Sequence, residues 1–377
     1  MITDPIRADA LLPSPPTHLD GRQGINRGRH SIRQIAADTD IEAIRLWLAE
    51  YAGSPHTLRS YRKEAVRLLL WSTRTQAKPV SSLTREDLLA YEAFLSRPPA
   101  GWIDTTRPRH GSDRRLFAGP LSPRSIRQAL GILSGLFNYL VAAGYLAGNP
   151  LALRRQRGHV VSRRATVERY LSQDLWRFIL DFIETPPQSS ARERQHHERV
   201  RWLFRLLYGA SLRASEAAQA RAGDLYQRRG RWWLAVVGKG GVAGDVPISE
   251  ALMADFARYR AFHGLPGLPL PEESTPLVMS VAGQTDKPLS PTAIYLIVKD
   301  IFRRAASALE VTDPAGAMTL RKASTHWLRH TSASHQADAG NDIRHIQRNL
   351  RHASIETTAI YLHAEEDRRH ADTTGTL

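Results

Sequence analysis

The chain has 377 residues, of which 42% are hydrophobic and none is cysteine; this predicts about two globular domains and excludes disulfides, thiolate metal sites and a cysteine nucleophile. It contains no run of about 18 apolar residues and no secretory signal pattern at its N-terminus, so we expect a cytoplasmic protein without a membrane partner. Lys and Arg number 52 against 37 Asp and Glu, and the formal charge of +15 favours a nucleic-acid partner, although an arginine-rich coding bias would produce the same excess.

The first half of the chain is predicted to be an arm followed by an all-α domain. Residues 1–38 contain Pro, Gly and Arg without a sustained apolar period, which predicts a flexible basic arm. Between residues 39 and 152, four segments place apolar residues at three- and four-residue steps, as helices do. Ser54 before Pro55, and Thr84 before an acidic first turn, are typical helix starts. A Pro-, Gly- and Arg-rich insertion at 97–120 interrupts the pattern.

The second half is predicted to be a mainly helical domain with a small antiparallel β-sheet. Residues 153–168 are rich in arginine and predict a linker, which either follows DNA phosphates or is simply solvated. Residues 169–377 form the second domain. In it, RWWLAVV at 231–237 lies between Gly-containing turns and VPIS follows, which predicts paired strands and a further short strand near Leu225. Helical periodicity surrounds these strands on both sides.

Three segments of this domain contain side chains suited to cleaving a DNA phosphodiester without a metal or ATP. The reaction needs a nucleophile, cations to offset charge on the phosphate oxygens, and an acid for the leaving oxygen. The segments GASLRASE, THWLRHTSAS and NLRHASIETTAIY supply two arginines, a carboxylate, three histidines and a tyrosine: Arg213, Glu216, His326, Arg329, His330, His352 and Tyr361. A lysine, Lys239, lies between the first two segments in the turn VVGKGG.

This ordered set resembles the tyrosine recombinase, or phage integrase, family. The strings SPHTLRSYRKEAVRLLLW, LSPRSIRQALGILSGLFNYL and GNP also resemble the core-binding domain of that family, so the resemblance covers roughly residues 41–364. It implies an all-α, SAM-like core-binding domain at 39–152 and a tyrosine-recombinase catalytic domain at 169–377. Together these domains would form a C-shaped clamp on DNA.

The resemblance implies a role for each residue that matches the family pattern. Arg213 and Arg329 would hold the scissile phosphate. Lys239 would protonate the leaving 5′-hydroxyl, and Tyr361 would form a 3′-phosphotyrosyl link. Taken singly, these residues would suggest a surface ion pair, a solubilising turn residue or a packing tyrosine. The complete set favours catalysis, since those ordinary uses give no reason for the four residues to occur in this order.

The remaining residues of the set have supporting roles in the same resemblance. His326 and His352 would donate hydrogen bonds to the phosphate, and His326 would also assist proton transfer. Glu216 would brace Arg213, and His330 would be a supporting residue on the helix of His326. His326 and His330 also have the i, i+4 spacing of zinc ligands, but Trp327 occupies the position where a zinc protease helix has Glu. We therefore expect neither a metal nor another cofactor.

Five arginines are candidates for further DNA contacts because each belongs to a segment that resembles the family: Arg59, Arg62, Arg124, Arg127 and Arg351. Arg351 departs from the family pattern, which usually has Gly before the last His. Arginine there either adds a phosphate contact or changes how closely its helix approaches a neighbour. The insertion at 97–120 is also unusually long, and it contacts DNA, contacts a partner or lacks order.

The resemblance implies strand exchange between two specific sites on double-stranded DNA by a homotetramer, with an accessory directionality protein as a possible further partner. Such enzymes integrate, excise or resolve mobile elements and replicons, and the sequence does not choose among these roles. Two other functions remain open. A type IB topoisomerase shares the phosphotyrosine chemistry but acts alone, and a non-catalytic, sequence-specific DNA-binding protein would use the same scaffold.

Overall fold

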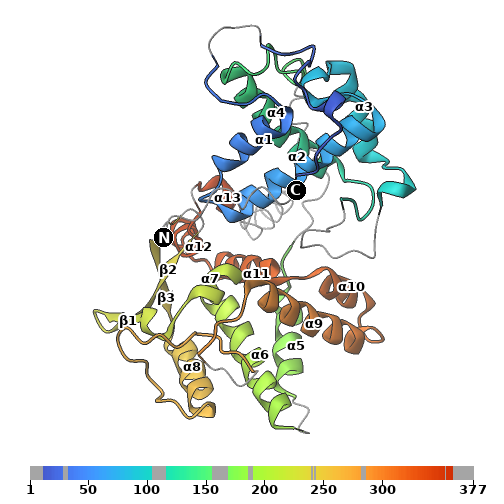
Figure 1. Ribbon diagram of the computed structural model, residues 1–377. Coiled ribbons are helices and arrows are strands. Elements are labelled where there is room, and N and C mark those ends of the chain that lie inside the picture. The colour runs from blue at the N-terminus through green and yellow to red at the C-terminus, as the bar shows by residue number, and fades with distance from the viewer. Residues whose placement is uncertain are drawn as a thin grey trace, which may run out of the picture. The chain divides into compact units, whose positions relative to one another are not determined.

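A computed structural model describes residues 12–28, 33–103, 116–154, 169–185, 190–238, 241, 243–281, 286–352 and 354–359. The chain divides into two compact units, Met1–Val161 and Ser162–Leu377 (Figure 1). The first is helical and the second is mainly helical with one three-stranded sheet, which confirms the predicted fold class. No helix in the described ranges is both long and apolar enough to cross a bilayer.

The described residues of the first unit contain four α-helices: α1 (Asp40–Ala49), α2 (Pro55–Thr75), α3 (Arg85–Ser96) and α4 (Pro123–Ala142). Helix α4 packs against the other three, and its apolar face buries Leu133, Leu136 and Phe137. The predicted helix start at Thr84 is confirmed, because the Thr84 side chain and Asp87 form a reciprocal capping box.

Part of the predicted flexible arm is instead packed on this unit. Leu12 and Leu19 are buried in the core, and the backbone of Asn26 accepts a hydrogen bond from the Ala147 N–H at 2.9 Å. The Arg27 guanidinium lies 3.8 Å from the centre of the Tyr145 ring. Isolated apolar residues and long-range backbone bonds hold the segment, and neither produces the periodicity by which helices are predicted. Residues 1–11 and 29–32 lie outside the described part of the chain.

The ends of the 97–120 insertion also belong to this unit. Phe117 is buried, and its ring lies edge-on to Phe94, with the ring centres 5.5 Å apart. Trp102 contacts Phe94 in the same way at 5.0 Å, and Ile103 forms a backbone bridge with Phe117. Residues 104–115, between these ends, are outside the described ranges.

In the second unit, further helices pack around a central helix, α6. In chain order, the described helices are α5 (Gln173–Glu184), α6 (Ala191–Gly209), α7 (Ala214–Gln219), α8 (Glu250–Phe262), α9 (Pro291–Leu309), α10 (Pro314–Lys322), α11 (Thr325–Asp338), α12 (Ile343–Leu350) and α13 (Glu356–Ala359). Helix α6 packs against α5, α7, α8, α9 and α11, and buries Leu203, Phe204 and Leu207. Helix α10 is not among the helices predicted from the sequence, although Asp313 caps it and Pro314 begins it.

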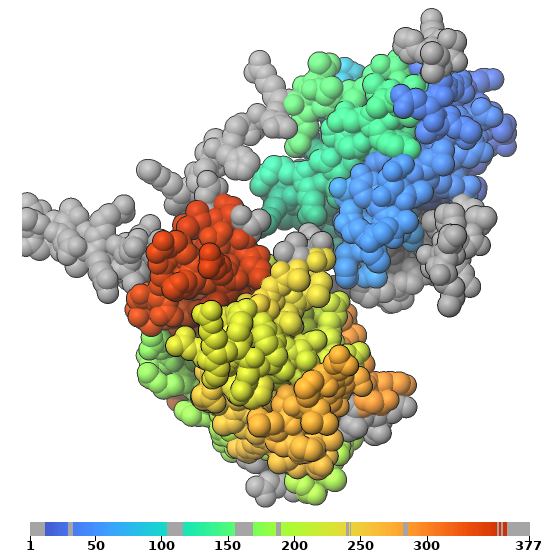
Figure 2. Space-filling view, turned by 90° about the vertical axis from the view of Figure 1, so that its left-hand side faces the viewer, coloured from blue at the N-terminus to red at the C-terminus, as the bar shows by residue number. Residues whose placement is uncertain are grey.

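The sheet of the second unit has the antiparallel order β1 (Leu225–Arg228), β2 (Arg231–Val237) and β3 (Ala243–Ile248). The predicted strand at 231–237 is confirmed as β2. Leu234 pairs with both Leu225 and Val246 across the sheet, and all three side chains are buried on the face toward the helices. Figure 2 shows the red surface of the C-terminal helices directly beside the yellow surface of the strands, where α12 packs on β3.

Candidate active site

Arg213 stands at the turn from α6 into α7. Ser211 has a left-handed backbone (φ 49°) that redirects the chain, and Arg213 is the N-cap of α7. The Arg213 backbone N–H donates to Glu216 Oε2 at 2.8 Å, and its Nη1 donates to Glu216 Oε1 at 2.7 Å. The Arg213 side chain is nevertheless 32% exposed, whereas Glu216 is buried. Glu216 thus braces an arginine that still faces solvent.

Arg329 lies beneath this turn. Its side chain is 1% exposed, its Nη1 donates to the Ser211 carbonyl at 2.7 Å, and its Nη2 donates to the carbonyl of Leu350. The Nη1 atom is also 3.7 Å from Glu216 Oε2. Arg329 therefore ties α11 to the turn before α7 and to the last residue of α12. This burial was not predicted, since the i, i+3 spacing from His326 indicates only that the two side chains share a helix face.

Arg351 reaches the same carboxylate from the end of α12. Its side chain is 8% exposed, and its Nη2 donates to Glu216 Oε2 at 2.5 Å. It was predicted as a DNA contact, but here the guanidinium points into the protein and not outward. Its backbone is left-handed (φ 52°, ψ 48°) at the C-cap of α12.

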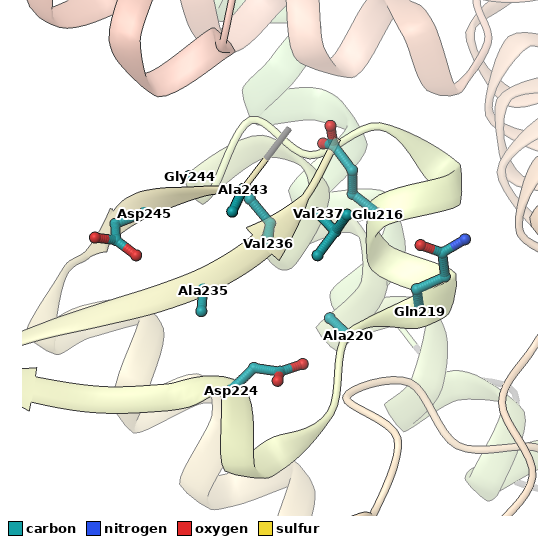
Figure 3. A pocket seen from close by; sticks show the side chains of 10 residues that line it. All are labelled: Glu216, Gln219, Ala220, Asp224, Ala235, Val236, Val237, Ala243, Gly244 and Asp245. Carbon is teal, nitrogen blue, oxygen red and sulfur yellow. The ribbon is translucent and has the colours of Figure 1, made fainter. Parts of the chain in front are cut away.

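A pocket of about 180 Å³ lies between α7 and the hairpin of β2 and β3. Figure 3 shows its lining, with Glu216 from α7 and Ala243, Gly244 and Asp245 from β3. Arg351 contacts two of these lining residues: it pairs with Glu216, and a Cβ added at Gly244 would lie 3.1 Å from its Cδ. Arg351 therefore lies at the edge of the pocket.

Glu216 is the electrostatic centre of this arrangement. Burial opposes ionisation of its carboxyl, but hydrogen bonds from Arg213 and the positive charges of Arg351 and Arg213 outweigh burial and hold the pKa below its usual value. Three arginines lie within 4 Å of this one carboxylate. These four side chains together carry an excess of positive charge, which suits the binding of an anionic phosphate.

Three histidines lie within the influence of the same charges. The rings of His326 and His330 meet edge-on, with centres 4.2 Å apart. Burial, followed by the charges of His326 and Arg329, lowers the pKa of His330 to about 3. Burial, Arg329 and Arg213 lower the pKa of His352 to about 4, and the pKa of His326 is lowered by desolvation and the same two arginines. At neutral pH these rings are uncharged and retain one N–H donor each.

His352 is oriented by its own turn. Its Nδ1 lies 3.0 Å from Thr358 Oγ1 in α13, and its carbonyl accepts a hydrogen bond from Gln347 in α12 at 3.1 Å. Thr358 is buried, so its hydroxyl holds the His352 ring from the protein interior. This role of Thr358 was not predicted, although its spacing of six residues from His352 is compatible with a contact across a short turn.

The described structure brings together six members of the predicted set: Arg213, Glu216, His326, Arg329, His330 and His352. Lys239 and Tyr361 lie outside the described residues. Among the described residues, no group of three or more His, Cys, Asp or Glu side chains could hold a metal ion.

The arginines predicted to contact DNA in the first unit lie on two helices. Arg59 in α2 is exposed, and Arg124 and Arg127 near the start of α4 are exposed as well. Arg62 is half-buried, and its Nε is buried without a hydrogen-bond partner in the described part of the chain. Three of these four arginines are thus accessible to an external partner.

Comparisons with known proteins agree on one relationship. A model of the phage integrase family matches residues 169–368. The tyrosine recombinase XerC of Rhodospirillum centenum is 30% identical over 323 residues, which cover 84% of this chain and 80% of that protein. XerC of Xylella fastidiosa strain 9a5c is 27% identical over 83% of this chain and 87% of its own length.

Two solved structures share the fold. The XerH site-specific recombinase in a post-cleavage complex with palindromic difH substrate is 18% identical, and the match covers 90% of this chain and 85% of that one with a TM-score of 0.60. A lambda integrase dimer bound to a COC′ core site is 16% identical over 86% of this chain and 77% of that one, with a TM-score of 0.55. At these identities the likeness concerns the fold.

Proposed function

Since the chain belongs to the phage integrase family and is a tyrosine recombinase, an enzyme that cleaves and rejoins DNA, we propose that it exchanges strands between two specific duplex sites through a 3′-phosphotyrosyl intermediate at Tyr361. The observation that carries this proposal is the convergence of Arg213, Arg329 and Arg351 on Glu216, with the neutral ring of His352 near the same arginines. These residues come from three separate segments, and packing alone does not require so many cations around one buried carboxylate.

In this proposal the cluster binds the scissile phosphate. Arg213 is the exposed cation, and its planar fork matches two phosphate oxygens. Neutral His326 and His352 donate hydrogen bonds to the same oxygens. Arg329 contributes positive charge from below the surface, and it reaches the phosphate directly if DNA binding displaces its hydrogen bonds to Ser211 and Leu350. Such donors act most strongly on charge that develops in the transition state.

The two residues outside the described ranges complete the reaction. A tyrosine hydroxyl is a weak nucleophile at neutral pH because its ordinary pKa is near 10, so Tyr361 depends on the cluster to hold the phosphate in line. Its oxygen attacks phosphorus as its proton passes to neutral His326. The bond from phosphorus to the 5′-oxygen of the next nucleotide breaks, and Lys239 donates a proton to that leaving oxygen. The phosphotyrosine keeps the bond energy, so a 5′-hydroxyl of a partner strand reverses the step without a cofactor.

The biological setting follows from the same assignment. In this proposal both units bind the duplex, with Arg59, Arg124 and Arg127 supplying phosphate contacts from the first unit. Four protomers synapse two sites in the cytoplasm, with or without an accessory directionality protein. The product is an integrated, excised or resolved mobile element or replicon.

A trapping experiment tests the nucleophile. A binding site is selected from a random duplex library with the full-length protein, and is rebuilt with a nick close to the cleavage position. The short 5′-hydroxyl fragment then diffuses away after cleavage, which prevents religation. We expect a protein–DNA adduct that is stable to SDS, is joined to the DNA 3′ end and maps to Tyr361.

Tyr361→Phe should abolish the adduct and leave site affinity within about threefold, because only the attacking oxygen is removed. Tyr295→Phe is the matched control, since Tyr295 is an exposed tyrosine on α9, and it should form the adduct normally. An adduct that persists in Tyr361→Phe, maps to another residue or joins the 5′ end would refute the assignment.

A further inference from the structure

Arg351 has a backbone conformation that disfavours its own side chain. Its φ of 52° and ψ of 48° lie in the left-handed region, which glycine adopts freely and which strains residues with a Cβ. The resemblance described above has Gly at this position. An arginine here requires an interaction that compensates for the strain.

The compensating interaction is with Glu216, on a different part of the fold. Arg351 Nη2 donates to Glu216 Oε2 at 2.5 Å, and its Nη1 donates to the Asn349 carbonyl at 2.8 Å. Charge-assisted bonds of this kind are the stronger class of protein hydrogen bonds. Strand β3 leaves room for the side chain, since a Cβ at Gly244 would lie 3.1 Å from Arg351 Cδ.

Arg351 determines how Glu216 presents its two oxygens. Oε2 accepts from Arg351 Nη2 and from the Arg213 backbone N–H, whereas Oε1 accepts from Arg213 Nη1. Because Arg351 and the Arg213 backbone N–H both hold Oε2, the carboxylate keeps the orientation in which Oε1 accepts from Arg213 Nη1. The Arg213 guanidinium is therefore positioned through Glu216.

Arg351 also fixes the turn between α12 and α13. The preceding carbonyl, that of Leu350, accepts a hydrogen bond from Arg329, and the following residue is His352. Arg329 thus holds Leu350, and the Arg351 side chain ties its own backbone to Glu216. Two consecutive residues of this turn are therefore attached to the cluster.

We propose that Arg351 is a positioning residue for strand cleavage: through Glu216 it aligns Arg213 on one side and the His352 turn on the other. This inference rests on the proposed function of the cluster. It assigns Arg351 no contact with DNA. Its loss should therefore slow the chemical step without weakening binding, and the effect should require Glu216.

The test uses the full-length protein and the nicked substrate under single-turnover conditions. Arg351→Gly relieves the backbone strain while removing the ion pair, so the protein should remain folded. We expect adduct formation to slow roughly 10- to 100-fold, the range expected when reacting groups are displaced by about 1 Å, with affinity for the site within about threefold. Arg351→Lys should recover part of the rate, because lysine keeps the charge but loses the fork.

Arg344→Ala is the matched control, because it removes the same charge from an exposed position of the same helix; its cleavage rate should stay unchanged. A double-mutant cycle with Glu216→Gln tests whether Arg351 acts through Glu216. Once Glu216 is altered, Arg351→Gly should slow cleavage by less than about threefold further, since the two residues act through one ion pair.

Hydrogen–deuterium exchange supplies a readout that does not need DNA. Peptides that cover residues 343–359 should exchange faster in Glu216→Gln, which leaves Arg351 itself intact, and to a similar extent in Arg351→Gly. They should be unchanged in Arg344→Ala. If the unaltered protein formed no adduct at Tyr361, the proposed function would fail, whereas this comparison would still decide whether the ion pair holds the turn.

Three results would overturn the inference. Arg351→Gly could cleave at the unaltered rate, it could lose site affinity and keep its rate at saturating DNA, or it could slow cleavage equally in the presence and absence of Glu216. The second result would make Arg351 a DNA contact, and the third would make its effect independent of the carboxylate.

Discussion

Each unit of the protein buries a carboxylate with arginine, and the two arrangements differ in origin. In the first unit, Glu64 and Arg67 are neighbours on α2, with Arg67 Nη1 2.6 Å from Glu64 Oε2. Arg67 also donates to the Leu116 carbonyl at 2.8 Å and lies 4.4 Å from the centre of the Phe117 ring. The pair thus anchors one end of the insertion to the helix.

In the second unit, Glu216 is shared by Arg213, Arg329 and Arg351, which come from the start of α7, from α11 and from the end of α12. The local pair on α2 is formed by adjacent turns of one helix, and both terminal nitrogens of its guanidinium bond within the protein. The Glu216 cluster forms only when distant segments pack, and it contains more cations than its carboxylate can neutralise. The first arrangement suits structure, and the second suits an anionic substrate.

The largest expected effect comes from Arg213, the exposed member of the cluster. Arg213→Ala should slow adduct formation on the nicked substrate by about 10²–10³-fold, as loss of one donor to a developing oxyanion does. The melting temperature should change by less than a few degrees, since Glu216 keeps two other arginines nearby. Single-turnover gel assays and calorimetry on the same samples check both parts. A rate within threefold of the unaltered protein would mean that the cluster does not act on the phosphate.

The second effect tests the local pair. Arg67→Met leaves the buried Glu64 carboxylate with Lys63, whose Nζ is 3.0 Å away, and should lower the free energy of unfolding by about 3 kcal/mol. The double variant Glu64→Leu/Arg67→Met should recover most of that loss, because no charge remains buried. Denaturant unfolding followed by circular dichroism measures the difference. Equal stabilities of the single and double variants would show that the Glu64–Arg67 pair is solvated. The cleavage rate of both variants at saturating DNA should stay within threefold of that of the unaltered protein.

The smallest effect concerns pH. The pKa of His330 is about 3 and that of His352 about 4 in the folded protein, whereas an unfolded histidine takes up a proton near pH 6.5. The unfolded state therefore binds more protons between pH 6.5 and 4, and stability should fall as the pH decreases through this window. We expect the melting temperature to drop by several degrees between pH 7 and 5, at roughly 2–4 °C per kcal/mol.

His330→Gln should reduce this pH-dependent drop, since glutamine does not titrate. His345→Gln, at an exposed position on α12, should leave the drop unchanged. A melting temperature of the His330→Gln protein that falls as steeply as that of the unaltered protein would argue against a buried, neutral His330.

Predictions from the sequence succeeded where the determining interactions are local. Thr84 caps α3 through a residue three positions away, and β2 occupies the apolar run between turns. They failed where the interaction spans the fold. The Arg351–Glu216 pair joins residues 135 positions apart, and the burial of Arg329 depends on the carbonyls of Ser211 and Leu350. Periodicity and motif order contain no information on such contacts, so they identified the residues of the cluster but not how these contact one another.

The packed N-terminal segment has a consequence for the order in which the protein is made. The Asn26 side chain donates to the Gly148 carbonyl, 122 residues later in the chain, at 2.8 Å. Ribosomes add about 5–20 residues per second, so Asn26 leaves the exit tunnel roughly 6–24 s before its partner. During that interval the segment can bond to Ser81 and Ser82, which are synthesised earlier, but not to the turn at Gly148. The first unit therefore closes only when its last turn has been synthesised, at a time when most of the second unit is still untranslated.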